Sequence, residues 1–391
     1  MKPFILILLV LIAAISAAQN RKMLVFDLQN NHVDTIETSS FDSLIIKDNT
    51  DFYPGDYDDD FCNLNQTVPQ ENTFPGAHYT KKVQASRLYD INDFPIRTSV
   101  KIFRIENDSL KNRCSGSLIS KRHVLTARHC VADFSSDTLS VKSLYVCPAF
   151  DNGEKNLNFD CAFVRKIYIF DKQKFSDLCV LELDQPIGKQ TGWISIGFDS
   201  DNTSLLDGIY YKFSYPAKTF LDLDSRSYNG DTLYCSYGTI SNADNWRLEV
   251  YSAVGIPGES GSSLIKIENK KMYISYGVQS FAHNIPHHRI NNIDFYPISS
   301  IIKNDLTADA EDPIEMDGTI SIYPNPTHGP LYIDIKPGDQ IKKIVLFESS
   351  GKKLLENNAI NQIDLSDFPS GNYFLHIQTN KRSRLIKLIK Y

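Results

Sequence analysis

Residues 124–130 read Val-Leu-Thr-Ala-Arg-His-Cys, an apolar run that ends on a histidine and a cysteine. Two later stretches also place polar, chemically reactive residues beside a short apolar run: residues 176–183 read Ser-Asp-Leu-Cys-Val-Leu-Glu-Leu, and residues 258–264 read Gly-Glu-Ser-Gly-Ser-Ser-Leu. Similar runs recur from residue 94 to residue 306, among them 99–105, 117–125, 178–183 and 272–278. Turn residues separate these runs, and none has a sustained helical period, so the sequence predicts an all-β barrel or sandwich.

The three stretches supply the residue types of a nucleophilic serine site. A serine hydroxyl is a poor nucleophile near neutral pH unless a base takes its proton and an acid orients that base. His129 is the candidate base, Asp177 the orienting acid and Ser260 the nucleophile, and the backbone N–H groups of Gly258 and Ser260 are candidates for an oxyanion hole. Asp160 also precedes an apolar strand and stays open as an alternative to Asp177.

Together the stretches resemble the chymotrypsin-like (trypsin-fold) serine peptidases over residues 88–305. Residues 125–130 look like the histidine motif of that family, and residues 258–261 look like its nucleophile motif, with Glu259 where the family usually has aspartate. The spacing agrees, because 48 residues separate His129 from Asp177 and 83 separate Asp177 from Ser260. The resemblance implies a two-barrel fold and a secreted serine endopeptidase that works through an acyl-enzyme intermediate, without a metal ion or an organic cofactor.

Seven cysteines follow the predicted signal peptide, so at least one has no partner within the chain. The resemblance implies a disulfide between Cys114 and Cys130. It would close a loop of about 16 residues, worth roughly 3 kcal/mol in the chain-entropy model. The pairing of the other five stays open, although Cys147 and Cys161 are close in sequence and Cys179 lies in an apolar run; these five are Cys62, Cys147, Cys161, Cys179 and Cys235.

The residues expected to line the specificity pocket do not favour a basic substrate. Trypsin-like enzymes that cut after Lys or Arg have an acid six residues before the serine, and this position is Val254. Residues 277–281 are similar to the pocket-wall strand of the family, in which Ser280 matches a serine that hydrogen-bonds to the catalytic aspartate. The succession of Tyr215-Pro216, residues 237–240 and Ser260 is similar to the bacterial glutamyl endopeptidase branch, which uses a wall histidine to receive the substrate carboxylate. Gln279 occupies that position and can donate a hydrogen bond but carries no charge.

The N-terminal part of the chain is expected to direct export. Residues 1–18 combine Lys2, an apolar run and small residues before the expected cleavage site, as in a secretory signal peptide. Residues 19–87 look like a propeptide, because Arg87-Leu88 lies at about the distance upstream of His129 at which the family is cut, and the freed amino terminus would then pair with Glu259. The alternative is a permanent N-terminal part of the mature protein. The acidic residues 56–60 are expected to form a solvated loop rather than a cation site.

The C-terminal part resembles a second family, the type IX secretion sorting domain. Residues 306–318 are rich in acidic side chains and predict an exposed linker. Residues 319–391 contain Tyr323-Pro324-Asn325-Pro326, similar to the opening of that family, and a basic, apolar end; strands are expected near 319–323, 331–335, 341–347, 371–378 and 384–390. The resemblance implies a small immunoglobulin-like sandwich that the type IX secretion machinery reads as an address.

Composition excludes several classes of protein. The chain of 391 residues carries a net charge of −6, whereas a protein that binds duplex DNA normally has a basic excess. After the signal peptide no stretch is long and apolar enough to span a membrane. His283, His287 and His288 are expected in a surface loop rather than in a metal site. The resemblance to serine peptidases implies polypeptide substrates. The rival interpretation is an inactive peptidase-fold surface protein that binds other proteins, and a third is a secreted esterase.

Overall fold

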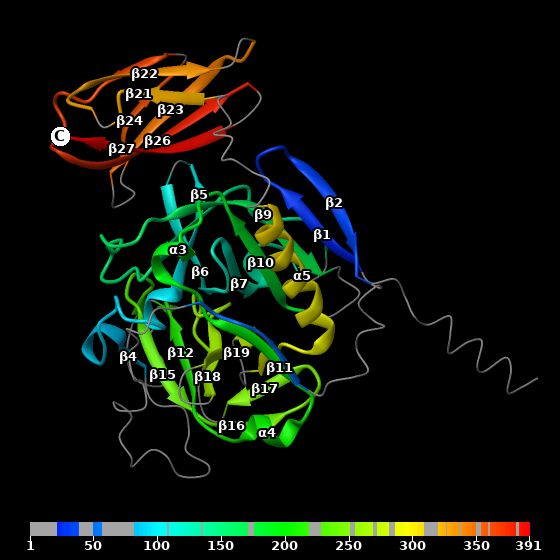
Figure 1. Ribbon diagram of the computed structural model, residues 1–391. Coiled ribbons are helices and arrows are strands. Elements are labelled where there is room, and N and C mark those ends of the chain that lie inside the picture. The colour runs from blue at the N-terminus through cyan, green and yellow to red at the C-terminus, as the bar shows by residue number, and fades with distance from the viewer. Residues whose placement is uncertain are drawn as a thin grey trace, which may run out of the picture.

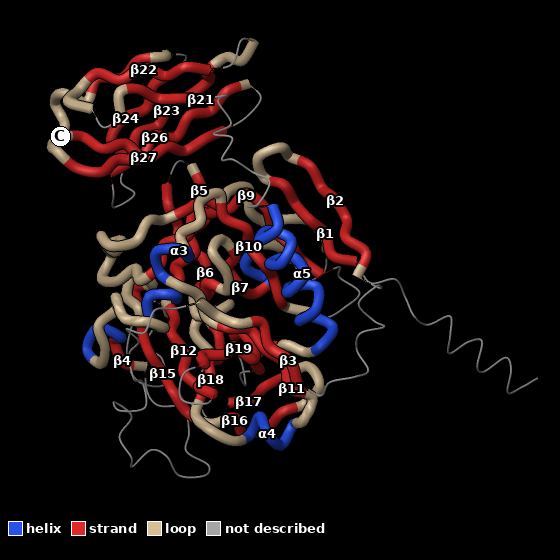
Figure 2. Tube along the Cα trace, viewed as in Figure 1, coloured by secondary structure: helices blue, strands red, loops and turns tan. Residues whose placement is uncertain are grey.

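The computed structural model contains three β-rich units, two of which form the predicted peptidase domain (Figures 1 and 2). It describes residues 22–38, 50–56, 82–107, 109–133, 136–170, 176–218, 228–250, 255–268, 272–280, 286–308, 320–325, 327–335, 338–348, 353–358, 360–380 and 383–391. The predicted signal peptide and most of the predicted linker lie outside these ranges.

The first unit is a closed six-stranded barrel. Its strands are β5 (Ser99–Glu106), β6 (Ser109–Leu118), β7 (His123–Ala127), β8 (Leu144–Pro148), β9 (Ala162–Phe170) and β10 (Leu178–Leu183). They pair in the order β10-β7-β6-β5-β8-β9, and a further pairing of β9 with β10 closes the sheet. All six residues of β10 are buried, because both of its neighbours and the barrel interior cover it.

The second unit is a more open barrel. Its principal strands are β11 (Ser195–Asp199), β12 (Tyr210–Ser214), β15 (Tyr234–Gly238), β16 (Ile240–Ala243), β17 (Arg247–Val250), β18 (Ser263–Glu268), β19 (Met272–Gln279) and β20 (Pro286–Arg289). The main path runs β16-β17-β20-β19-β18-β12-β15, and β11 joins β19 in parallel. Shorter elements on and between the two barrels are β13 (Ala217–Lys218), β14 (Tyr228–Asn229), α3 (Gly188–Thr191), α4 (Asn202–Leu206), η3 (Ala85–Arg87), η4 (Ile96–Thr98) and η5 (Arg128–Cys130).

Residues N-terminal to position 88 contribute strands to both barrels. β1 (Lys22–Asp27) pairs with β9, and β2 (His32–Glu37) extends the sheet beyond β1. β3 (Thr50–Tyr53) pairs with β11, and β4 (Val83–Gln84) pairs with β15. Met23 is only 1% exposed and packs into the core, so this segment shares the hydrophobic interior of the peptidase domain.

One helix differs from the sequence prediction. α5 (Asn292–Ala308) follows β20 and packs against β11, where the rings of Phe295 and Phe198 lie 5.2 Å apart. The side-chain oxygen of Asn291 accepts hydrogen bonds from the first backbone N–H groups of the helix, at Ile293 and Asp294. The expectation that no segment is helical was therefore wrong here, and the predicted linker begins inside the last turn of this helix.

The run 117–125 also differs from the prediction, because it is a hairpin rather than one strand. β6 ends at Leu118 and β7 begins at His123. Between them the Ser120 hydroxyl accepts hydrogen bonds from the backbone N–H groups of Arg122 and His123, at 3.2 and 3.0 Å. A serine side chain that binds the backbone two and three residues later stabilises a tight turn.

The third unit is a sandwich of two small sheets at the C-terminal end (orange to red in Figure 1). One sheet is formed by β21 (Ile320–Tyr323), β22 (Pro330–Ile335) and β25 (Gln362–Asp364); the other by β23 (Ile341–Glu348), β24 (Lys353–Asn357), β26 (Gly371–Thr379) and β27 (Ser383–Lys390). Alternate residues of these strands form a separate apolar core that includes Leu331, Ile344 and Leu375, each 0% exposed. The five strands expected from the sequence are present, and the prediction did not include β24 and β25.

Candidate active site

Two neighbouring strands of the first barrel bring His129 and Asp177 together. His129 follows the end of β7, and Asp177 precedes the start of β10, which runs antiparallel to β7 with Leu178 opposite Ala127. The backbone N–H of Arg128 donates to the carbonyl oxygen of Asp177 at 2.9 Å. The end of one strand and the start of the next therefore lie side by side, although the two residues are 48 positions apart.

The Asp177 carboxylate fixes the orientation of the imidazole. It is 1% exposed and accepts hydrogen bonds from the backbone N–H of His129 at 2.9 Å and from Nδ1 of its ring at 2.8 Å. The Ser280 hydroxyl donates a further hydrogen bond to the same carboxylate. In a neutral imidazole whose Nδ1–H donates to Asp177, Nε2 is the nitrogen that can accept a proton.

Asp160, the alternative acid, lies in another environment. Its backbone N–H donates to the side-chain oxygen of Gln190 at 2.7 Å, and the amide of Gln190 donates back to the Asp160 carboxylate at 2.8 Å. This reciprocal pair ties a loop to α3. Of the two candidate acids, Asp177 is the one beside His129.

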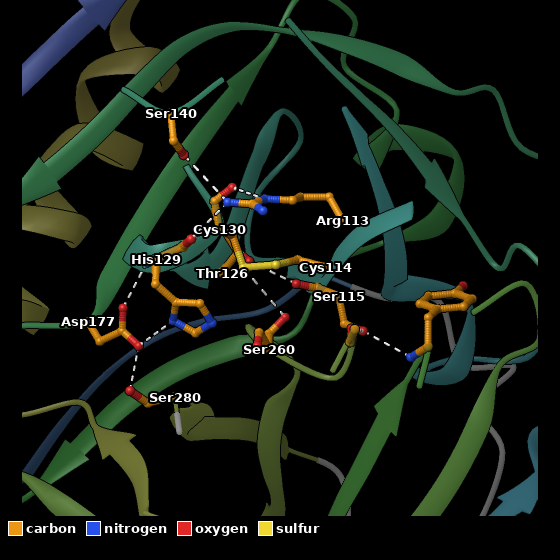
Figure 3. The surroundings of a disulfide bond; sticks show 12 residues. Arg113, Cys114, Ser115, Thr126, His129, Cys130, Ser140, Asp177, Ser260 and Ser280 are labelled. Atoms are coloured by element: carbon orange, nitrogen blue, oxygen red, sulfur yellow. Dashed lines mark hydrogen bonds and ion pairs between the residues drawn. A yellow bond between two sulfur atoms is a disulfide. The ribbon is translucent and has the colours of Figure 1, made fainter. Parts of the chain in front are cut away.

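Ser260 lies on the loop between β17 and β18, across the imidazole from Asp177 (Figure 3). Two glycines with positive φ shape this loop, Gly258 at +90° and Gly261 at +84°. A Cβ atom on Gly258 would lie 2.3 Å from the carbonyl oxygen of Tyr215, and one on Gly261 would lie 2.0 Å from the hydroxyl of Thr126. Neither position has room for a side chain, which explains the Gly-x-Ser-Gly pattern in physical terms.

The backbone around Ser260 presents two available donors. No described group accepts a hydrogen bond from the N–H of Gly258 or of Ser260. Their carbonyl groups, in contrast, are both bound by Ser115 on β6: its hydroxyl donates to the Gly258 oxygen at 2.7 Å, and its N–H donates to the Ser260 oxygen at 2.9 Å. The same hydroxyl accepts from the N–H of Tyr215 at 2.9 Å. An oxyanion hole requires backbone N–H donors that are available to substrate, and the Ser115 contacts fix the two peptide groups that would supply them.

Two disulfides stabilise the first barrel. Cys114 is bonded to Cys130, the pair implied by the family resemblance, and this bond joins β6 to the turn that carries His129 (Figure 3). Cys147 is bonded to Cys161, a pairing that the sequence left open. Cys179 is a buried thiol on β10, where it packs as a small apolar side chain. Cys62 lies outside the described residues.

Glu259, next to the candidate nucleophile, is a fully buried carboxylate. Oε1 accepts from the Ser214 hydroxyl at 3.0 Å, and Oε2 accepts from the Ile256 N–H at 2.8 Å. Two ammonium groups face it: Lys212 Nζ lies 3.4 Å from Oε1, and Lys82 Nζ lies 3.6 Å from Oε2. Burial alone would raise the pKa of Glu259, but the charges of Lys212 and Lys82 together with these hydrogen bonds hold it below its usual value.

Lys212 is as deeply buried as its partner. Burial lowers the pKa of Lys212 to about 8, against the stabilising charge of Glu259 and with the like charge of Lys82 acting in the same direction as burial. Its Nζ also donates to the side-chain oxygen of Gln279 at 3.0 Å. Gln279, expected in the pocket wall, is therefore a buried residue that links Lys212 to the loop of Ser260, because its backbone oxygen accepts from the Gly261 N–H at 2.8 Å. Val254 lies outside the described residues.

The expectation of a surface loop for the histidines near position 287 was wrong. His287 and His288 lie on β20 and are 0% and 5% exposed. His288 lies behind the site, where its Nε2 is 3.3 Å from the Asp294 carboxylate and the Ser176 hydroxyl donates to that carboxylate at 3.0 Å. Pairing of β20 with β17 and β19 buries this segment. His283 lies outside the described residues.

Sequence reasoning missed three residues that support the site: Ser115, Lys82 and Lys212. Ser115 is part of the Cys-Ser-Gly stretch before β7, and a buried serine beside a disulfide cysteine is a weak signal. Lys212 interrupts an aromatic run, Tyr-Tyr-Lys-Phe-Ser, in which a lysine flanked by core residues is unusual. No local pattern marks Lys82.

Comparisons with known proteins give two family matches. Residues 86–303 match the family model of trypsin, and residues 321–391 match that of the secretion system C-terminal sorting domain. Similar solved structures include a Glu endopeptidase, at 18% identity and a TM-score of 0.44, which covers 59% of this chain and 97% of its own. The protease Anisep from Arthrobacter nicotinovorans is 18% identical, with a TM-score of 0.41 and coverage of 54% and 98%. No curated protein matches the chain significantly.

The trypsin model covers more than half of the chain, so the protein belongs to the trypsin family and is a serine-type endopeptidase. The sorting domain makes it a protein that is secreted or displayed at the cell surface. The predicted fold class, a two-barrel peptidase domain followed by a small β-sandwich, is confirmed. Within the described ranges no helix is long and apolar enough to cross a membrane.

Proposed function

We propose that the protein cleaves polypeptides through a triad of Ser260, His129 and Asp177 and an acyl-enzyme intermediate. The observation that carries this proposal is the 2.8 Å hydrogen bond from His129 Nδ1 to the buried Asp177, with Ser260 on the other side of the ring. The Ser260 hydroxyl attacks the substrate carbonyl while His129 Nε2 accepts its proton. Asp177 stabilises the imidazolium that forms.

The amides of Gly258 and Ser260 receive the negative charge that develops on the carbonyl oxygen. The tetrahedral intermediate then collapses as His129 returns the proton to the leaving amine, which departs and leaves an ester on Ser260. Water, activated by the same histidine, hydrolyses this ester and regenerates the enzyme. Ser115 supports these steps because it holds both carbonyls of the donor loop.

Substrates with Lys or Arg before the scissile bond are not expected to be preferred. Position 254 is valine, and the buried carboxylate of Glu259 is already paired with two lysines. A basic substrate side chain would enter the pocket without a counter-charge, which costs free energy. Gln279 and Ser280, both buried, are the polar residues proposed to border the pocket.

The two ends of the chain are proposed to serve export. Residues 1–18 act as the signal peptide, and residues 319–391 are recognised by the type IX secretion machinery. The match of residues 321–391 to a secretion sorting domain supports this route.

The test compares the secreted protein with its Ser260→Ala variant on an unbiased peptide library, with cleavage sites read by mass spectrometry. In a comparable enzyme, loss of the nucleophile lowers kcat by about 10⁶. Ser262→Ala is the matched control, because its buried hydroxyl has no hydrogen-bond partner among the described residues. Cleavage that persists in Ser260→Ala, or that is absent from the wild type, contradicts the proposal. The cut sites also report whether Lys and Arg are disfavoured.

A further inference from the structure

The buried charges beside Ser260 come from distant parts of the chain. Glu259 belongs to the loop of the nucleophile, Lys212 to β12, and Lys82 to the segment that precedes the trypsin-like sequence. The Lys82 side chain is 9% exposed, and the Glu259 side chain is 0% exposed. A buried carboxylate of this kind needs a cationic partner, because an uncompensated charge in the interior is strongly destabilising.

Strand pairing fixes the position of Lys82. The next two residues form β4, in which Val83 lies opposite Cys235 and Gln84 opposite Tyr234. The N–H of Ala85 then donates to the carbonyl oxygen of Leu233 at 2.8 Å. The backbone on the C-terminal side of Lys82 is thus part of the second barrel, and its ammonium group is directed to Glu259.

In zymogens of the family that the sequence resembles, a cut frees an amino terminus whose ammonium pairs with the acid before the serine. Here that acid already has a cation in the uncut chain, since Lys82 Nζ lies 3.6 Å from Glu259 Oε2. The expected new terminus, Leu88, is six residues further on, and its N–H donates to Ala85 at 2.9 Å in a tight turn. Lys82 therefore has the electrostatic role that cleavage would otherwise supply.

The rest of the N-terminal segment is also integral to the domain. β1 pairs with β9 at five positions, and β3 pairs with β11 at four. Met23 and Tyr53 are 1% and 9% exposed, so removal of these strands would uncover apolar surface in both barrels.

Glu259 transmits this electrostatic pairing to the catalytic loop. Its carboxylate accepts from the Ile256 N–H, and its own N–H donates to the Ile256 carbonyl at 3.1 Å, so the turn from 256 to 259 is closed from both sides. This turn carries Gly258. Without its cations the carboxylate would leave the interior for water, and the amides of Gly258 and Ser260 would move with it.

We propose that Lys82 and Lys212 are positioning residues that hold Glu259, and through it the oxyanion loop, in the competent arrangement, so that the peptidase is active without a cut at Arg87-Leu88 and retains residues 22–84. This inference rests on the proposed function. It assigns the segment 19–87 to the mature enzyme rather than to a propeptide.

The test uses the full secreted chain with three substitutions: Lys82→Met, Lys82→Arg and Arg87→Gln. Arg87 is exposed, so the substitution Arg87→Gln removes only the expected cleavage site. We expect Arg87→Gln to have the activity of the wild type. We expect Lys82→Met to lose about 10²- to 10³-fold in kcat with KM changed little. Lys82→Arg should recover most of this loss, because the charge is restored. Affinity for a peptide boronate, which forms a tetrahedral adduct, falls in parallel in Lys82→Met, whereas affinity for the corresponding peptide product does not. We expect the intact mass of the active wild-type species to be that of a chain that still contains residues 22–84.

The outcomes separate the two proposals. A wild-type chain that cleaves nothing, whether whole or cut after Arg87, refutes the proposed function. A wild-type chain that becomes active only once residues before position 88 are lost refutes the present inference and leaves the peptidase intact. Wild-type kcat in Lys82→Met, or loss of activity in Arg87→Gln, also overturns it.

Discussion

The hydroxyl of Ser115 offers the sharpest test of how the site is held, because one oxygen atom connects three elements. It donates to the Gly258 carbonyl and accepts from the Tyr215 N–H, at 2.7 and 2.9 Å, and the residue is 0% exposed. Ser115→Ala leaves both backbone groups without this partner. An unsatisfied buried polar group costs roughly 1–3 kcal/mol, so we expect the loss of partner at both groups to lower the free energy of unfolding by about 2–6 kcal/mol.

The same substitution should reduce turnover, because the Gly258 peptide becomes free to rotate. Loss of one oxyanion donor costs about 10²- to 10³-fold in kcat, and we expect a fall toward this range with little change in KM. Urea unfolding and steady-state kinetics on one library-derived peptide measure the two effects. Ser99→Ala is the control, since Ser99 is equally buried on the adjacent strand but its hydroxyl has no partner among the described residues. Equal losses in both variants, or wild-type kcat in Ser115→Ala, would refute this reasoning.

Three further predictions follow from the geometry. Asp177→Asn should lower kcat by about 10⁴-fold because the imidazole loses its acceptor, whereas Asp160→Asn should cleave the same peptide at the wild-type rate; an equal effect of both would contradict the assignment. Burial lowers the pKa of His123 from 6.5 to about 4, so the unfolded chain binds the proton first as pH falls. The free energy of unfolding should therefore fall by about 3 kcal/mol between pH 6.5 and pH 4. In urea titrations at several pH values, wild type and His123→Gln should differ in how steeply this free energy changes with pH, and an equal pH dependence would count against the prediction. Replacing Cys114 and Cys130 by Ala should cost about 3 kcal/mol of stability, and an unchanged thermal midpoint would show that the bridge contributes little.

The local sequence pattern was sufficient to predict much of the fold. The expected run 178–183 coincides with β10, and 272–278 lies within β19, because short apolar runs between turn residues form buried strands. α5 was missed for the opposite reason. It contains Pro297, which ordinarily ends a helix, and several isoleucines and aromatics that favour strands. Its conformation is supported by the local Asn291 cap and by packing against Phe198, and only the second of these is a tertiary contact.

The residues of the candidate site likewise fall into those that local sequence pattern predicts and those that it does not. The candidate triad could be located because each member sits in a local motif, in an order and spacing that match a known constellation. Lys82 could not, since 177 residues separate it from Glu259 and nothing near either residue indicates the partner. Ser115 is similar: its role arises only when β6 meets the loop before β18. The candidate catalytic residues could be predicted from local motifs, whereas the residues that contact and hold their loops could be found only in the assembled barrels.

The strands contributed by the N-terminal segment have a consequence for the order of folding. β1 is made early, but its partner β9 ends at Phe170, and β3 must wait for β11, which ends at Asp199. β4 must wait longer, because β15 begins at Tyr234. Pairings between segments so distant in the sequence close large loops and form slowly. Because a chain is made from its N-terminus, these first strands exist before their partners. The first barrel can close only once β10, which ends at Leu183, has been made, and the second barrel only once β20 has followed.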